Sequence, residues 1–154
     1  MTIETRIFGE VTIDDDKIIN FENGIVGFPD LQKFALIHDA EQGNNAGIRY
    51  MQSLDEPNFA MPVMDPLIVA PDYNPVVDDE ILKPIGEIEA DELLVLVTVT
   101  VPKDLKLMSV NLRGPIVINV KERKAVQIIL DDDSYKVKFP IYDILDARKK
   151  EGAC

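Results

Sequence analysis

The last third of the chain shows the most regular alternation of apolar and polar residues. Apolar side chains recur at every second position in 108–112, 116–120 and 135–139, and 125–130 is a fourth apolar segment. A period of two is typical of a strand that buries one face. Because these segments follow one another at intervals of roughly eight to twelve residues, they predict an antiparallel meander.

The first two thirds of the chain contain shorter apolar segments separated by turn residues. They predict strands at 3–8, 11–13, 17–21, 34–38, 48–54 and 59–64, and an extended segment at 67–70. Four prolines between 62 and 75 place the segments near them at edges or bulges, because proline cannot donate to a ladder. Leu93–Val101 is almost entirely apolar or Thr, which predicts a central strand.

Turn and helix signals fall between these segments. Asn23 and Gly24 form a turn dipeptide, three consecutive aspartates at 14–16 suit another turn, and 40–47 reads as a loop. Acidic residues at 78–80 favour the start of a short helix that Pro84 would stop. The spacing of apolar residues in 141–150, with lysines at the end, predicts a short C-terminal helix.

These elements predict a mostly β protein. About ten short strands do not remain one flat, open sheet without curling, and closure removes exposed edges. We therefore expect a single-domain antiparallel β-barrel-like fold with one or two short helices. A chain of 154 residues is long enough to bury its own core without a disulfide or a metal. The expected domain is 1–154, with its core at about 3–142.

Cysteine and histidine are nearly absent, which limits the chemistry available. Cys154 and His38 are the only residues of their kinds, so an intramolecular disulfide and a Cys/His zinc site are excluded. We expect no cofactor. A free terminal thiol fits a reducing compartment, and the nine residues 93–101 are too short to span a bilayer. These features predict a soluble, cytoplasmic protein.

Charge is strongly acidic and unevenly distributed. The formal net charge is −12; residues 1–100 carry 20 acids and five bases, and residues 101–154 carry eight acids and eleven bases. An acidic surface opposes binding to nucleic acid or to an anionic membrane. It keeps the protein soluble and can also steer a basic partner.

Two alternative functions remain open from the residues alone. Six basic residues, with Tyr135 and Phe139 between some of them, would suit single-stranded RNA; they are Arg113, Lys121, Arg123, Lys124, Lys136 and Lys138. Paired carboxylates would suit an acid/base enzyme, although no nucleophile motif accompanies them. The aspartate runs at 14–16 and 131–133 lack the spacing of a calcium loop and read as solvated turns.

Three amide side chains recur at intervals of eight residues in the regular part of the chain. They are Asn111, Asn119 and Gln127, and we expect Asn119 and Gln127 to lie opposite each other on antiparallel strands. Such amides form either a hydrogen-bonded polar face of the fold or a patch that binds a partner peptide. Since no catalytic or metal-binding motif stands out, elimination favours a protein-binding module.

Three stretches, taken in order, resemble one known family. They are FENGIVGFPDLQKF at 21–34, MPVMDPLIVAPDY at 61–73 and MSVNLRGPIVINVKERKAVQIIL at 108–130. The chain is similar to the bacterial flagellar assembly factors of the FliW family over about residues 3–142. The third stretch carries most of the resemblance. Val26 stands where family members often have Pro.

The resemblance implies a role that is not enzymatic and needs no cofactor. Family members bind newly made flagellin near its C-terminal segment, in the cytoplasm. They also bind the carbon storage regulator CsrA, an RNA-binding repressor of flagellin translation, in competition with flagellin. Release of flagellin by export then lets the factor sequester the repressor. The resemblance implies no direct nucleic-acid or membrane contact, and a small β-barrel-like fold.

The resemblance also suggests partner-binding residues. An apolar groove for an amphipathic flagellin helix is expected at Phe59, Met61, Met64 and Tyr73, because methionine adapts well at binding surfaces. Asp65, Asn111, Asn119 and Gln127 match the family's motifs and complete the candidate set.

Overall fold

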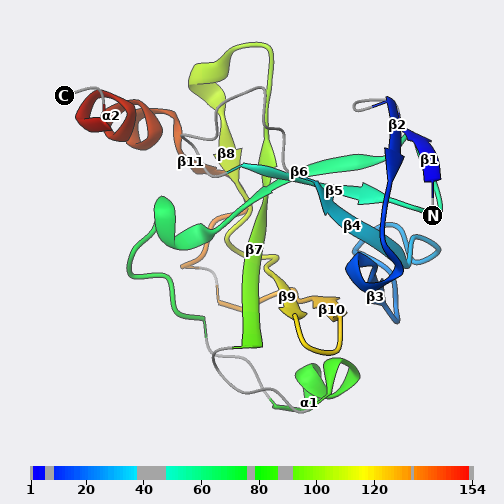
Figure 1. Ribbon diagram of the computed structural model, residues 1–154. Coiled ribbons are helices and arrows are strands. Elements are labelled where there is room, and N and C mark those ends of the chain that lie inside the picture. Colours follow the sequence, from blue (N-terminus) through cyan, green and yellow to red (C-terminus); the bar gives the residue numbers. More distant parts are fainter. Residues whose placement is uncertain are drawn as a thin grey trace.

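The computed structural model describes residues 2–5, 9–37, 48–75, 79–86, 92–132 and 134–152 (Figure 1). His38, the expected loop at 40–47 and Cys154 lie outside these residues. The strands are β1 Thr2–Thr5, β2 Gly9–Thr12, β3 Ile19–Phe21, β4 Lys33–Ile37, β5 Arg49–Ser53, β6 Ala60–Met64, β7 Leu93–Thr100, β8 Ser109–Val110, β9 Ile116–Asn119, β10 Lys124–Gln127 and β11 Phe139–Pro140.

Seven of these strands close into a barrel. Their order is β7, β6, β5, β4, β3, β10 and β9, and β9 pairs with β7 to complete the ring. At the closure Leu94 lies opposite Ile118. The barrel-like fold predicted from the sequence is therefore confirmed. One detail differs: β3 and β10 run parallel, with Phe21 opposite Ala125, because a long connection brings β10 back beside the first barrel strand.

The meander predicted for the last third is only partly right: β9 and β10 form the expected antiparallel pair, but the strands before and after them do not continue it. β9 pairs with the first half of β7, and β8 pairs with the last two residues of β7. Both therefore occupy the same edge of one long strand, one after the other, and do not pair with each other. β8 pairs instead with β11, Phe139–Pro140, so only Phe139 of the strand expected at 135–139 is part of a strand.

The two largest apolar clusters lie on either side of the barrel wall. The first lies inside the barrel and includes Phe21, Phe34 and Met51, none of which is exposed. The rings of Phe21 and Phe34 meet edge to face at 5.3 Å, an arrangement that favours aromatic pairs. The second cluster lies around β8 and includes Val97 and Ile141.

The β1–β2 hairpin forms a separate two-stranded sheet outside the barrel. It pairs Thr2–Thr5 with Gly9–Thr12 and appears at the edge of Figure 1, next to β4 and β5. Ile3 joins Ile13, Ala35 and Leu54 in a small apolar cluster. The hairpin is therefore attached to the barrel by a few buried side chains.

The helices are short, as expected. α1 spans Asp79–Leu82 and continues as the 3-10 turn η4 Lys83–Ile85, and α2 spans Tyr142–Gly152. The segment expected to be extended at 67–70 is instead the 3-10 turn η3 Pro66–Ile68, because Pro66 suits the first position of such a turn. Further 3-10 turns are η1 Asp15–Lys17 and η6 Leu105–Leu107. Among the described residues, no helix has the length and apolarity needed to cross a membrane.

Candidate functional site

Asn119 is a fully buried polar residue at the end of β9. Its Nδ2 donates to the carbonyl of Ile85 at 2.7 Å, and its Oδ1 accepts from the backbone N–H groups of Lys121 and Glu122 at 3.1 Å each. These bonds fix the β9–β10 turn and tie η4 to the outer face of the barrel. The Asn119 side chain therefore finds its hydrogen-bond partners within the chain. This agrees with the interpretation of the amides as a hydrogen-bonded polar face of the fold.

Gln127 and Asn111 also have hydrogen-bond partners within the chain. Gln127 Oε1 accepts from the N–H of Val26 at 2.9 Å, and its Nε2 donates to the carbonyl of Gly114 at 3.2 Å. Asn111 Oδ1 accepts from the N–H of Arg113 at 3.0 Å. The three amides thus hold backbone segments from the first and third of the sequence stretches that carry the family resemblance, together with Ile85, which lies outside them.

The expected pairing of Asn119 with Gln127 is wrong. Asn119 lies opposite Lys124, and Gln127 lies opposite Ile116. The tight turn at 120–123, in which Arg123 has a positive φ of 56°, sets this register. A turn of that length brings the strands together three residues earlier than the amide spacing suggested.

Phe59 and Met61 pack at the edge of the barrel core rather than beside Met64. The Phe59 ring lies 4.9 Å from that of Phe28 and 6.4 Å from that of Phe34. Phe28 is 47% exposed, so this aromatic pair reaches the surface.

Met64 and Tyr73 belong to the second cluster. Met64 has no exposed surface. The Tyr73 hydroxyl donates to the carbonyl of Leu112 at 2.6 Å, and its ring meets that of Tyr135 at 5.0 Å. Burial, and secondarily the neighbouring Tyr135, raises the pKa of Tyr73 well above its ordinary value. The four residues expected to form one apolar groove are therefore divided between two clusters, because β6 is covered on both faces.

A hollow of about 460 Å³ lies beside the first half of β7, and two of the candidate residues, Asp65 and Tyr73, line it. Asp65 caps η3 by accepting from the N–H of Leu67 at 2.9 Å. The remaining lining is mostly apolar: Pro66, Leu67, Asn74, Pro75, Leu82, Leu93, Leu94, Val95, Pro115 and Val117. We call this space the β7 hollow. Its volume is in the range of pockets that bind ligands.

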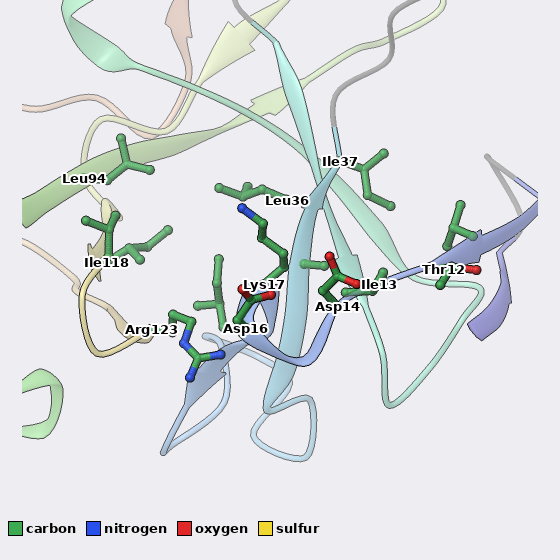
Figure 2. Close-up of a pocket in the computed structure, with 14 residues that line it drawn as sticks. Thr12, Ile13, Asp14, Asp16, Lys17, Leu36, Ile37, Leu94, Ile118 and Arg123 are labelled. Atoms are coloured by element: carbon green, nitrogen blue, oxygen red, sulfur yellow. The ribbon is translucent and has the colours of Figure 1, made fainter. Parts of the chain in front are cut away.

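A second hollow, of about 690 Å³, lies between the β1–β2 hairpin, η1 and the barrel (Figure 2). Apolar side chains such as Leu36, Leu94 and Ile118 line it together with the charged groups of Asp14, Asp16, Lys17 and Arg123. None of the eight partner-binding candidates lies there, and Arg123 is the one basic residue considered for RNA binding that does. Besides Arg123, only the three aspartates at 14–16 pointed to this region in the sequence. They form the start of the η1 turn, where the carbonyl of Asp15 accepts a hydrogen bond from Arg123 at 2.6 Å.

The basic residues considered for RNA binding are partly used within the fold. Arg113 donates to the carbonyl of Leu130 at 3.1 Å, Arg123 to that of Asp15, and Lys121 lies 4.0 Å from Glu92. These contacts hold turns and strand ends. These three basic residues therefore have a role in holding the fold, which does not depend on RNA binding.

The described residues include no group of three His, Cys, Asp or Glu side chains close enough to hold a metal ion. The lowered pKa of Asp132 comes chiefly from hydrogen bonds donated by Ser134, with Arg113 as a minor cause. This carboxylate caps a local turn.

Comparison with known proteins decides the family. The pattern of the FliW protein family matches residues 2–141. The chain belongs to the FliW family of flagellar assembly factors. A FliW from Lachnospira eligens is 45% identical, covering 98% of this chain and 99% of that protein, and one from Lachnoclostridium phytofermentans is 39% identical over the whole of both chains.

The fold of the FliW family agrees with the structure described above. The crystal structure of a flagellar assembly factor FliW superposes with a TM-score of 0.83 at 28% identity. The match covers 92% of this chain and 97% of that one. The seven-stranded barrel is therefore an architecture that this FliW chain shares with a solved relative.

Proposed function

We propose that this chain serves flagellar assembly by binding partner proteins in the cytoplasm, without catalysing a reaction. Flagellin, through its C-terminal segment, and the carbon storage regulator are the two partners, and they compete. The observation that best supports this proposal is the β7 hollow in a chain of the FliW family. A mostly apolar recess with one carboxylate suits the binding of a peptide segment.

The β7 hollow is the proposed binding site for flagellin. Leu67 and Leu93 are 52% and 36% exposed, so apolar surface is available at its rim. Burying such surface against an apolar segment stabilises a complex by roughly 25 cal/mol for each Å² removed from water. Of the candidate residues, Asp65 and Tyr73 support this location because both line the hollow.

Charge supports the proposal for the second partner. The first 100 residues carry 20 acids against five bases, and an RNA-binding repressor needs a basic surface for phosphate. Complementary charge speeds the encounter of two proteins. Sequestration of the repressor would release translation of flagellin, and bound flagellin would prevent that sequestration.

Isothermal titration calorimetry tests this function. The full chain is titrated with the C-terminal segment of its host's flagellin, first alone and then with the carbon storage regulator already bound. The proposal predicts one-to-one binding that the regulator weakens. Binding that the regulator leaves unchanged would remove the competition, and binding of neither partner would overturn the function.

A further inference from the structure

Among the residues that the structure describes, no strand pairs with the first half of β7 along the edge that faces the β7 hollow. We call this edge the open edge of β7. β6 pairs with β7 through only two residue pairs, Val63 with Thr98 and Met64 with Val97. Continued by two residues, this register would place Pro66 opposite Val95. Pro66 has no N–H and begins η3, so the chain leaves the ladder at this point.

The backbone groups of Leu93 and Val95 point to that open edge. In an antiparallel ladder, the N–H and C=O of one residue face the same neighbouring strand, and successive residues alternate between neighbours. The carbonyls of Glu92 and Thr98 accept from Val120 and Asn111, so the even positions of β7 face β9 and β8. The odd positions therefore face the hollow. Within the described chain, no hydrogen bond joins the N–H or C=O of Leu93 or Val95 to a partner.

The space beside this edge is lined mostly by apolar side chains. The lining of the β7 hollow, about 460 Å³ in volume, includes Asp65, Pro66 and Leu67, which follow β6, and Leu93 and Val95 of β7. It also reaches across β7 to Pro115 and Val117. Leu94, whose side chain packs at the edge of the barrel core, also lines the hollow. An inserted chain would thus find apolar neighbours on both of its faces.

We propose that the open edge of β7 binds an extended segment of a protein partner, which adds a strand through the backbone groups of Leu93 and Val95. An extended peptide supplies alternating donors and acceptors that match this edge, which a helix does not. Asp65 is the one charged side chain among the described residues that line the hollow, so the segment carries apolar residues with a Lys or Arg at the end near Asp65. The inference rests on the proposed function, and it specifies how the partner is held.

Amide hydrogen exchange measured by NMR tests the edge in the free protein. Leu94 and Leu96 face β9 and serve as internal controls for Leu93 and Val95. The inference predicts that the Val95 amide exchanges at least about tenfold faster than that of Leu96. Equal protection of the two amides would mean that the edge is already occupied and would overturn the inference.

The same measurement with the host's flagellin bound tests the strand addition. The amides of Leu93 and Val95 should become protected while those of Leu94 and Leu96 change little. Calorimetry of the same samples reports binding separately. Binding with no new protection overturns the added strand and leaves the proposed function standing; absence of binding to flagellin and to the carbon storage regulator overturns both.

A pair of substitutions separates backbone from side chain. Val95→Pro removes the N–H at the open edge, where proline is tolerated, and Val95→Ala removes the side chain but keeps the N–H. We expect Val95→Pro to bind flagellin about fivefold to tenfold more weakly than Val95→Ala, with both variants folded by circular dichroism. Equal affinity of the two folded variants would contradict the inference.

Discussion

Single polar residues determine how distant segments of this chain are joined. Asn119, Gln127 and Tyr73 each reach backbone groups far away in the sequence: Ile85, Val26 and Leu112 respectively. Their identities were visible in the sequence as motif residues. Their roles were not, because an amide on a strand looks the same whether it meets a partner protein or a carbonyl of its own chain.

Replacing Asn119 tests the importance of these bonds. Asn119→Ala would leave the Ile85 carbonyl and two backbone N–H groups without their partner inside the fold. We expect a loss of about 2–3 kcal/mol in the free energy of unfolding, measured with urea. Asn58→Ala, at an exposed amide, is the matched control and should change that free energy by less than about 0.5 kcal/mol. Equal losses in the two variants would contradict the buried role of Asn119.

Tyr73 makes stability sensitive to alkaline pH. Its folded pKa is raised above the ordinary value of 10.0, so the contribution is fully present below pH 10.0 and is lost as pH rises further, when the unfolded state releases the proton first. Tyr73→Phe should cost about 1 kcal/mol at pH 7 through loss of the bond to Leu112.

Urea unfolding of both proteins at pH 8 and pH 10.5 checks this prediction. The parent chain should lose more stability between the two pH values than Tyr73→Phe does. Tyr142→Phe, at a partly exposed tyrosine, should behave like the parent. A parent and a Tyr73→Phe variant with the same pH dependence would show that Tyr73 ionises equally in both states.

At the scale of elements, the sequence predicted where most strands lie but not how they pair. Apolar segments placed β4, β5, β6 and β7, and alternation placed β9, each within one or two residues of its observed bounds. It gave no information on the parallel pairing of β3 with β10, or on β8 and β9 sharing one edge of β7, because pairing depends on contacts between distant segments. The β7 hollow depends on where β6 leaves that ladder, and so it was not predictable.

The turn at Asn23 and Gly24 requires a glycine, and the loss of stability on replacing that glycine can be measured. Gly24 has φ +69°, and a Cβ there would lie 2.5 Å from the Pro29 carbonyl oxygen. Gly9 has φ +66° with nothing within 4 Å of such a Cβ, so the two glycines differ only in crowding.

Thermal and urea unfolding of the two alanine variants separates the two effects. Gly9→Ala should cost about 1–2 kcal/mol, the price of a left-handed conformation for an L-residue. Gly24→Ala should cost more than about 3 kcal/mol, because backbone must also move. Similar losses would mean that the turn at 21–31 adapts without strain.

At the scale of the whole molecule, two features support the proposed function. One is the uneven charge of the chain, and the other is the β7 hollow, which two of the candidate residues line. The family assignment and the barrel were both foreseen, since the motifs span nearly the whole chain. The single-domain extent of 1–154 and the partner-binding residues stay predictions.

Acidic steering should be visible in the kinetics of regulator binding. The association rate of the carbon storage regulator, followed by stopped flow, should fall at least about tenfold between 0.05 and 0.5 M salt, since screening shortens the reach of charge. The dissociation rate should change much less. An association rate that is independent of salt would contradict the proposal that the acidic surface steers the carbon storage regulator.

The most direct test of the central claim compares two exposed leucines in similar 3-10 turns. Leu67 lies in η3, capped by Asp65, and lines the β7 hollow; Leu107 lies in η6, capped by Asp104, and does not. Calorimetry measures how the flagellin C-terminal segment binds Leu67→Asp and Leu107→Asp. We expect Leu67→Asp to weaken binding at least about tenfold, because a complex would bury an unpaired charge, while Leu107→Asp binds like the parent. Unchanged affinity in Leu67→Asp would contradict the β7 hollow as the partner-binding site.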